Sequence, residues 1–398
     1  MYSSSLKQKL HAQYLPWVIF TLSVGLIPIL YPPYANFVKY GIFILGPVCL
    51  YCCQPKTEFL NNCHALGSFI KPWGWWYGGI LVMIIIHGVS GNSMFLNTLL
   101  IMILLFLTLR PINLQREWIL WAFCLNIIIF STLILLSLAL YGVTTDLLLL
   151  NKNRLVPEIS ILGNICFISY IFNRKEVSHC LRRVLLLSSV LTLCVIIFSE
   201  VRTALLGWLA LTPIFFICKS STSRRFFFLF VGIILVSFAM FWFTGRLQEG
   251  LTDLAQYNAG NSSSSWGLRL EFWKLAFLGF LSEPLVGWGY KPFTSLMDAG
   301  LPFPFKDFTK IAHFHSDYFS QLVSYGLVGV LSWLASMFFL CKDSIRDPAR
   351  LSIIFSTLAM GFSERIWHYN STAITMIMVC WVLLYLSSES RLKMDSRL

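Results

Sequence analysis

Residues 117–141 read EWILWAFCLNIIIFSTLILLSLALY, and after the opening Glu117 this stretch has no charged side chain. A helix satisfies its own backbone hydrogen bonds inside lipid, and about 17 to 25 residues are needed to cross the hydrocarbon core. The stretch is therefore predicted to span a membrane as a helix.

Similar apolar runs recur along the chain, which is 57% hydrophobic and 12% charged, whereas about a quarter of the residues are charged in soluble proteins. This composition excludes an ordinary soluble domain. Because the runs recur almost to the C-terminus, no cleavable targeting segment is expected. The fold class is predicted to be an all-α integral membrane protein. About twelve spans are expected, at residues 15–31, 34–53, 74–91, 94–110, 117–141, 157–173, 182–199, 203–218, 226–244, 316–340, 349–363 and 371–387.

The net charge of +12 is explained by topology without nucleic acid. If alternate connections are counted, one side of the membrane holds both termini, 19 of the 30 basic residues and seven of the 18 acidic ones. Connections rich in Lys and Arg stay in the cytoplasm, so this side is predicted to be cytoplasmic. The expected location is a bacterial inner membrane, crossed several times.

The residues between the predicted ninth and tenth spans form a long insertion, 245–315, which the same count places in the periplasm. It divides the chain into spans one to nine (1–244), the periplasmic loop (245–315), and spans ten to twelve with a cytoplasmic tail (316–398). Within it, residues 266–277 show the pattern of an amphipathic surface helix.

Several ionisable residues flank the predicted periplasmic ends of the spans, where charges are costly and usually functional. They are Arg154, Glu200, Arg202, His313, His315, Asp317, Glu364, Arg365 and His368, and Arg269 lies in the loop on the same side. Arg154, Arg202 and Arg269 are candidates for binding a diphosphate, because a guanidinium donates paired hydrogen bonds to phosphate oxygens. A single arginine at a helix end can equally be a membrane-interface anchor.

The sequence His313-Phe-His315-Ser-Asp317 permits two interpretations. Side chains at every second position of an extended backbone share a face and would suit a metal, but they diverge if Asp317 begins a helix. Alternatively, neutral His315 acts as a general base on a sugar hydroxyl. The eleven cysteines lack the paired spacing of a zinc site, and no metal or other cofactor is expected. Glu200 and Asp317 are possible supporting carboxylates, and His313 is otherwise an interfacial polar residue.

Three motifs resemble those of the bacterial O-antigen ligase family, which joins surface polymer to lipid A-core. His315-Ser316 is followed after nine residues by Gly326-Leu-Val-Gly329. Arg269-Leu-Glu-Phe-Trp273 precedes Glu283-Pro284-Leu-Val-Gly287-Trp-Gly289, and Ser199-Glu-Val-Arg202-Thr203 follows the seventh predicted span. Arg154 is a weaker match to a further arginine of the family.

The resemblance implies a glycosyltransferase C-like enzyme that transfers O-antigen from undecaprenyl diphosphate to a sugar hydroxyl of lipid A-core without a metal and with inversion. It assigns catalysis to His315 and diphosphate binding to Arg202, Arg269 and, less closely, Arg154, and it assigns no role to Glu200. The implied partners are the lipid-linked O-antigen, the core oligosaccharide and membrane lipid.

An O-antigen polymerase, which uses the same donor, is the alternative within the enzyme class. A transporter or flippase is a further alternative, for which ionisable or helix-breaking residues are expected near the middle of the bilayer. The predicted spans contain almost none. A purely structural membrane protein is disfavoured by the motif-bearing insertion.

Overall fold

The computed structural model describes residues 56–395, except 89–92, 111–114, 142–151, 174–176, most of 219–244, 291, 301–313 and 368–370. All regular structure within these residues is helical, as the composition predicted. The first two predicted spans and most of the ninth lie outside the described residues. The helices are α3 (Lys56–Ile70), α4 (Gly74–His87), α5 (Ser93–Leu109), α6 (Arg116–Tyr141), α7 (Lys152–Phe172), α8 (His179–Ser199), α9 (Arg202–Leu209), α10 (Thr212–Ile217), α12 (Arg246–Asn258), α13 (Ser265–Ser282), α14 (Pro292–Asp298), α15 (Asp317–Ser344), α16 (Pro348–Gly361) and α17 (Ser371–Asp395).

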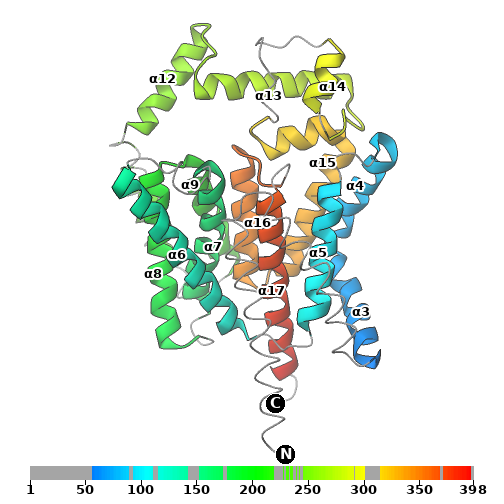
Figure 1. Ribbon diagram of the computed structural model, residues 1–398, viewed down its shortest axis with the longest axis vertical. Helices are drawn as coiled ribbons and strands as arrows, with labels where there is room; N and C mark the ends of the chain where they lie inside the picture. Colours follow the sequence, from blue (N-terminus) through cyan, green and yellow to red (C-terminus); the bar gives the residue numbers. More distant parts are fainter. Residues whose placement is uncertain are drawn as a thin grey trace, which may run out of the picture.

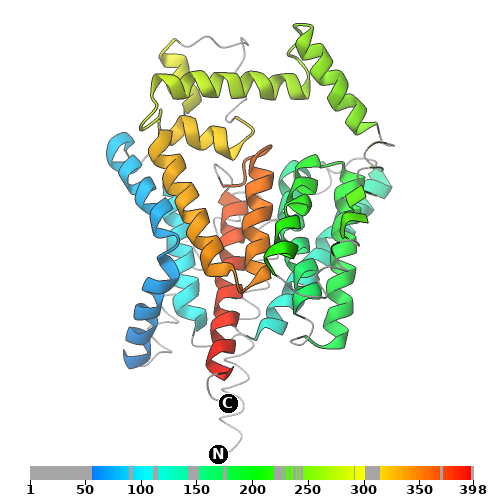
Figure 2. The same ribbon diagram turned by 180° about the vertical axis from the view of Figure 1, so that it is seen from behind.

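Most of these helices form an upright bundle, and one end of the bundle is covered by a separate layer (Figure 1). Helices α6 to α9 form one group, helices α3 to α5 form another, and α16 and α17 stand between them (Figures 1 and 2). Helix α13 lies across the end of the bundle, with α12 and α14 beside its two ends. The described residues of the insertion, 245–290 and 292–300, therefore form a helical cap over one end of the bundle.

Four of the described helices, α6, α7, α8 and α15, are long and apolar enough to cross a membrane. The pair α3 and α4, bent by 80° at its break, would make a fifth if it is one span. Shorter apolar helices cover Phe95–Leu107, Arg202–Ile217 and Ala373–Ser388, where spans were also predicted. The described chain is thus an all-α membrane protein, and the total of about twelve spans stays a prediction.

Two local expectations need correction, and one helix was not predicted. The predicted span 203–218 is two helices, α9 and α10, separated by a turn at Ala210 and Leu211. Helix α7 begins at Lys152, before Pro157, so Arg154 lies inside its first turn and not ahead of it. The link before the third predicted span contains α3, whose polar residues hid its helical character from an apolar-run search.

The end of the bundle opposite α13 is held together by a buried ion network. The α15–α16 turn lies at this end (Figure 2), and Asp347 in that turn receives hydrogen bonds from Arg116 Nη2 at 2.7 Å and Nη1 at 3.0 Å. Arg350 reaches the same carboxylate at 3.3 Å, and Ser388 of α17 donates to it at 2.7 Å. The charges therefore join the starts of α6 and α16 to α17.

Candidate functional site

His315 lies between the cap and the start of α15, in an unusual backbone conformation. Its φ of 50° is in the left-handed region. Non-glycine residues seldom adopt this conformation, and those that do are often found at functional sites. Its ring stacks on Phe272 of α13, with ring centroids 6.1 Å apart, and 31% of the side chain is exposed. The imidazole is therefore held against the cap with part of its surface open.

Glu364, in the link between α16 and α17, faces the imidazole of His315 and the guanidinium of Arg269. Its Oε1 lies 3.7 Å from His315 Nδ1, and its Oε2 lies 4.0 Å from Arg269 Nη2. Burial raises the pKa of Glu364, but His315 and Arg269 lower it by more, so this pKa lies below its ordinary value. The carboxylate is thus held ionised between a histidine and an arginine.

The α16–α17 link is fixed to the start of α15. The buried carboxylate of Asp317 accepts hydrogen bonds from the backbone N–H groups of Ile366 at 2.7 Å and Trp367 at 2.9 Å. A Cβ at Gly361 would lie 2.8 Å from Asp317 Oδ2, so only glycine fits there without movement. Asp317 therefore positions the segment that carries Glu364, and its contacts with the backbone are those of a structural residue.

Two arginines from different helices approach this cluster. Arg269 of α13 lies over the Trp266 ring at 5.9 Å, and 22% of its side chain is exposed. Burial lowers the pKa of Arg269, Glu364 raises it, and the neighbouring positive charge of Arg202 lowers it further. Arg202 is the first residue of α9, and its Nη2 lies 3.5 Å from Glu249 Oε2 of α12. Two guanidinium groups near one another make a site for an anion with more than one charge.

The link that carries Glu364 is also tied to the start of α9, because Thr203 Oγ1 and Ser363 Oγ are 3.0 Å apart. Helix α13 is fixed in turn by Trp273, whose Nε1 donates to the Phe314 carbonyl at 3.2 Å and whose ring stacks on Phe319. Arg202, Arg269, His315 and Glu364 therefore come from four segments that are cross-linked by hydrogen bonds and ring contacts.

The glycine motifs shape the junction between the cap and α15. Gly326 interrupts α15 with φ 59° and ψ −158°, a conformation reserved almost entirely for glycine. At this kink, Trp288 N donates to Val323 O at 2.9 Å, Gly289 N to Ser324 O at 2.8 Å, and Leu327 N to Pro284 O at 2.9 Å. The segment after α13 is thus bonded into the break in α15, the helix that begins directly after His315-Ser316.

The structure describes the other predicted site residues to different extents. The side chain of Arg154 and all of His313 lie outside the described residues, so their roles stay predictions. Glu200, two residues before Arg202, is the C-cap of α8 and has a left-handed conformation, with φ 59°. Among the described residues, no three His, Cys, Asp or Glu side chains gather as a metal site would require.

The sequence did not predict that Glu364 contacts both His315 and Arg269. It was one of several charges on the predicted periplasmic side, and nothing in its local sequence distinguishes it. A usable signal was the short link between the last two predicted spans, which keeps Glu364 near the ends of both.

A family model described as O-antigen ligase matches residues 187–334, from within α8 to within α15. The match includes Arg202, Arg269, His315 and both glycine motifs, and it confirms the resemblance expected from them. No curated protein sequence matches the chain.

Proposed function

We propose, from this O-antigen ligase domain, that the chain transfers O-antigen polysaccharide from undecaprenyl diphosphate to a sugar hydroxyl of lipid A-core. The observation that carries the proposal is the cluster of Arg202, Arg269, His315 and Glu364 at the capped end of the bundle. It combines a base with groups that bind a diphosphate, and these are the two functions that such a transfer needs.

His315 is the proposed general base. With the Nδ1–H directed toward Glu364, the Nε2 lone pair takes the proton of the acceptor hydroxyl as its oxygen attacks the anomeric carbon. The bond from that carbon to the diphosphate oxygen breaks as the new glycosidic bond forms on the opposite face, so the configuration inverts. Glu364 fixes the ring orientation and stabilises the imidazolium that results.

Arg202 and Arg269, with Arg154 as a possible third, are the proposed diphosphate ligands. Their charges stabilise the negative charge that develops on the leaving diphosphate, a task that a divalent metal performs in other enzymes. Arg202 lies 3.5 Å from Glu249, and Arg269 lies 4.0 Å from Glu364. Both distances are longer than a charge-assisted hydrogen bond. A diphosphate that bonds more closely would replace or share these contacts.

The proposed orientation places the cap and the site in the periplasm and both termini in the cytoplasm of a bacterial inner membrane. The count of basic residues supports this orientation, because the excess of Lys and Arg lies in the connections on the predicted cytoplasmic side. The insertion 245–315 is then the periplasmic loop of a multi-span, glycosyltransferase C-like enzyme.

The central test is His315→Ala in cells that lack the endogenous activity, with His179→Ala as control, because His179 is an exposed histidine at the start of α8. We expect His315→Ala to lower ligation by about 10² to 10⁴-fold, the usual contribution of a general base. The gel should then show bare core, with polymer still on its carrier. Normal ladders at normal protein levels would overturn the assignment. Core bearing single repeat units would instead indicate a polymerase.

Metal independence is tested with purified protein, defined lipid-linked donor and defined core. Transfer should continue in the presence of a chelator if arginines supply the positive charge. Loss of activity that magnesium or manganese restores would contradict this part of the proposal.

A further inference from the structure

Four aromatic side chains from three segments pack against one another at the capped end of the bundle. The ring centroids of Trp273 and Phe319 are 5.3 Å apart, and those of Trp273 and Phe362 are 5.5 Å apart. Tyr318 adds a fourth ring, 6.4 Å from that of Phe362. Phe362 is 53% exposed, and the other three side chains are partly buried. Together the four rings form one aromatic surface that joins α13, the first turn of α15 and the C-cap of α16.

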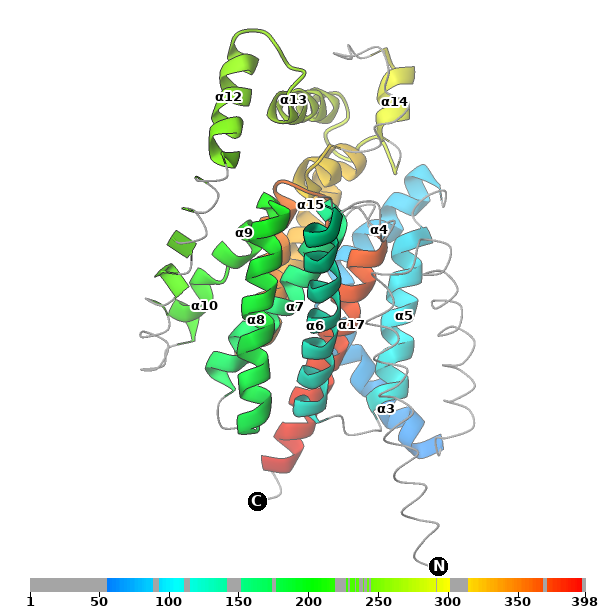
Figure 3. The same ribbon diagram turned by 60° about the vertical axis from the view of Figure 1, so that its left-hand side comes forward.

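The aromatic surface is attached to both segments that carry the proposed base and its carboxylate. Trp273 Nε1 donates to the carbonyl of Phe314, the residue before His315. Phe362 lies two residues before Glu364, whose Oε1 is 3.7 Å from His315 Nδ1. The first turns of α15 lie between α13 and the rest of the bundle, so these segments meet beneath the cap (Figures 2 and 3). The exposed ring of Phe362 therefore lies close to the groups that would activate an acceptor hydroxyl.

The position of the aromatic surface along α13 separates it from the proposed diphosphate ligands. Helix α12 lies at one end of α13, and Arg202 faces Glu249 of α12 at 3.5 Å (Figure 1). Trp273 is four residues beyond Arg269, about 6 Å farther along α13 from α12. In a displacement with inversion, the attacking oxygen and the leaving diphosphate lie on opposite sides of the anomeric carbon. The acceptor is therefore expected on the side away from α12, where the aromatic surface lies.

The chemistry of the aromatic surface is suited to a sugar. The C–H groups on one face of a pyranose ring carry partial positive charge and pack on the negative face of an aromatic ring. The hydroxyl groups of a sugar also need hydrogen-bond partners, and Glu364 and His315 lie in the adjoining segments. An exposed ring beside a carboxylate and an imidazole meets both requirements.

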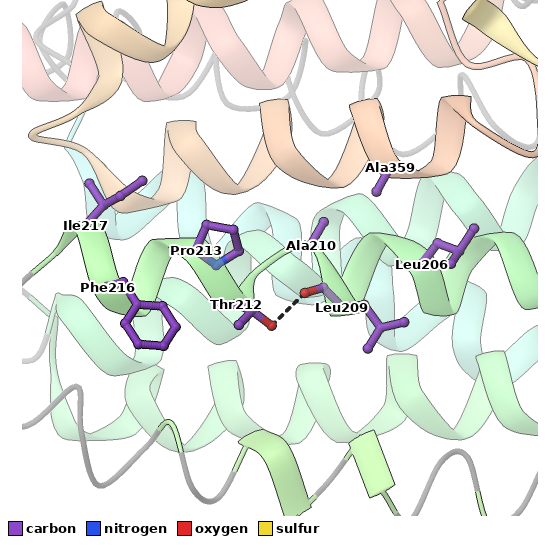
Figure 4. A pocket seen from close by; sticks show the side chains of 8 residues that line it. All are labelled: Leu206, Leu209, Ala210, Thr212, Pro213, Phe216, Ile217 and Ala359. Carbon is purple, nitrogen blue, oxygen red and sulfur yellow. Dashed lines mark hydrogen bonds between the residues drawn. The ribbon is translucent and has the colours of Figure 1, made fainter.

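A hollow beside α9 and α10 lacks this combination (Figure 4). Its volume is about 640 Å³, and the described residues that line it carry no charged group. The lining is mostly aliphatic, and the hydroxyl of Thr212 is bonded to the Leu209 carbonyl at 2.7 Å. A sugar therefore matches the aromatic surface and not this hollow.

We infer that the aromatic surface binds the acceptor, with a sugar of the lipid A-core oligosaccharide stacked on the exposed ring of Phe362. The inference rests on the proposed function, because it takes His315 as the base and the arginines as diphosphate ligands. It places the acceptor hydroxyl at His315 from the side opposite to α12. The stacked ring fixes the orientation of the core sugar, so that one hydroxyl is directed toward the imidazole.

Substitutions of Phe362 test the inference by steady-state transfer kinetics with purified protein, lipid-linked O-antigen and lipid A-core. Phe362→Leu keeps an apolar side chain for packing and for contact with lipid but removes the ring, whereas Phe362→Tyr keeps the ring. We expect the KM for core to rise about three- to tenfold in Phe362→Leu, through the loss of one stacking contact, and to stay near the wild-type value in Phe362→Tyr. The KM for the donor should not change in either variant.

Phe198→Leu is the matched control, because Phe198 is 60% exposed near the end of α8 at the same end of the bundle. Both KM values should stay at the wild-type level in this variant. An unchanged KM for core in Phe362→Leu overturns the inference, as does an equal rise in Phe362→Leu and Phe362→Tyr. A rise confined to the KM for the donor also overturns it, and assigns the aromatic surface to the donor saccharide.

Equilibrium dialysis measures the same contact without catalysis. The probe is radiolabelled core oligosaccharide freed from lipid A, and the proteins are the wild type, Phe362→Leu and Phe198→Leu in detergent. We expect Phe362→Leu alone to bind the oligosaccharide about three- to tenfold more weakly. Equal binding by all three proteins contradicts the inference.

The two experiments separate this inference from the proposed function. If core oligosaccharide binding depends on the Phe362 ring but the wild type transfers no O-antigen to core, the saccharide site stands and the proposed function fails. If transfer by the wild type is normal but Phe362→Leu behaves like Phe198→Leu, the proposed function stands and the assignment of the aromatic surface fails.

Discussion

At the scale of single residues, Glu364 connects the proposed base, His315, to a proposed diphosphate ligand, Arg269. One of its oxygens faces His315 and the other faces Arg269, and 14% of its side chain is exposed. A carboxylate in this position favours the imidazole tautomer that carries its proton on Nδ1 and its lone pair on Nε2. In the proposed mechanism, it also places a negative charge beside Arg269, where the donor diphosphate would bind.

Glu364→Gln should lower kcat by at least about tenfold, at the lower end of what base catalysis contributes, because the amide keeps the shape but not the charge. The KM for the lipid donor should rise little or fall, since a negative charge beside the diphosphate is removed. Steady-state transfer with varied donor concentration measures both constants.

Glu249→Gln is the matched control, because it makes the same chemical change at a carboxylate that is 53% exposed and faces Arg202 instead of His315. It should leave kcat near the wild-type value. Equal kcat losses in the two variants would contradict the role given to Glu364.

At the scale of helices, the kink of α15 depends on Gly326, a position where any side chain would clash with the neighbouring backbone. A Cβ at Gly326 would lie 2.5 Å from the backbone of Leu285, and the backbone conformation is itself closed to other residues. The glycine motif is therefore explained by the docking of the cap on α15.

Gly326→Ala should destabilise the protein by at least about 2 kcal/mol, through backbone strain and overlap together. Gly300→Ala is the control, since Gly300 also has positive φ, 72°, but an added Cβ there would have no atom within 4 Å. The control should lose only about 1 kcal/mol. The two variants are compared by the thermal midpoints of the purified proteins in detergent. Equal midpoints would contradict the role given to close packing at Gly326.

The ion network at the opposite end carries a prediction about pH. Burial raises the pKa of Asp347, but Arg116, Arg350 and Ser388 lower it by more, so it lies well below its ordinary value. A lowered pKa in the folded state contributes stability that is fully present above the ordinary value of about 3.9 and is lost as the pH falls toward the folded value.

Asp347→Asn should therefore cost about 3 kcal/mol at pH 7, because two buried arginines lose their counter-charge while the N-cap hydrogen bonds can be kept. The difference from wild type should narrow as the pH is lowered below about 4. Asp343→Asn, at a side chain that is 37% exposed, should cost less than about 1 kcal/mol. Thermal midpoints measured across this pH range test the predicted direction of the pH dependence. A difference between Asp347→Asn and wild type that stays constant with pH would contradict the prediction.

At the scale of the whole molecule, the cap and the ion network lie at opposite ends of one bundle (Figures 1 and 2). The proposed orientation puts the cap in the periplasm and the network in the cytoplasm. Ser282 at the end of α13 and Cys180 near the start of α8 are both exposed and sample the two ends.

Single cysteines at position 282 or 180, in an otherwise cysteine-free protein, test this orientation. A membrane-impermeant maleimide should label Ser282→Cys from the periplasm in cells with an intact inner membrane. It should reach Cys180 only after that membrane is permeabilised. The reverse pattern would invert the topology and with it the proposed location of the site.

Several features could be predicted from sequence because they depend on local properties. Hydrophobicity and run length predicted α6, α7, α8 and α15, which are long and apolar enough to cross a membrane, and the motifs singled out Arg202, Arg269 and His315. The break between α9 and α10 was missed because Ala210 and Leu211 are as apolar as a continuous helix. Pro157 suggested a helix start that lies five residues earlier, since proline is accepted near a helix N-terminus.

The sequence by itself predicted a helical membrane protein in which residues 187–334 match a family model described as O-antigen ligase, because hydrophobicity and motif spacing are local properties of the chain. Only the tertiary structure decided that Glu364 faces His315 and Arg269, that Arg202 lies near Arg269, and that Asp317 holds the link that carries Glu364. Those relations depend on how segments far apart in the sequence pack against one another. Neither hydropathy nor local spacing contains that information.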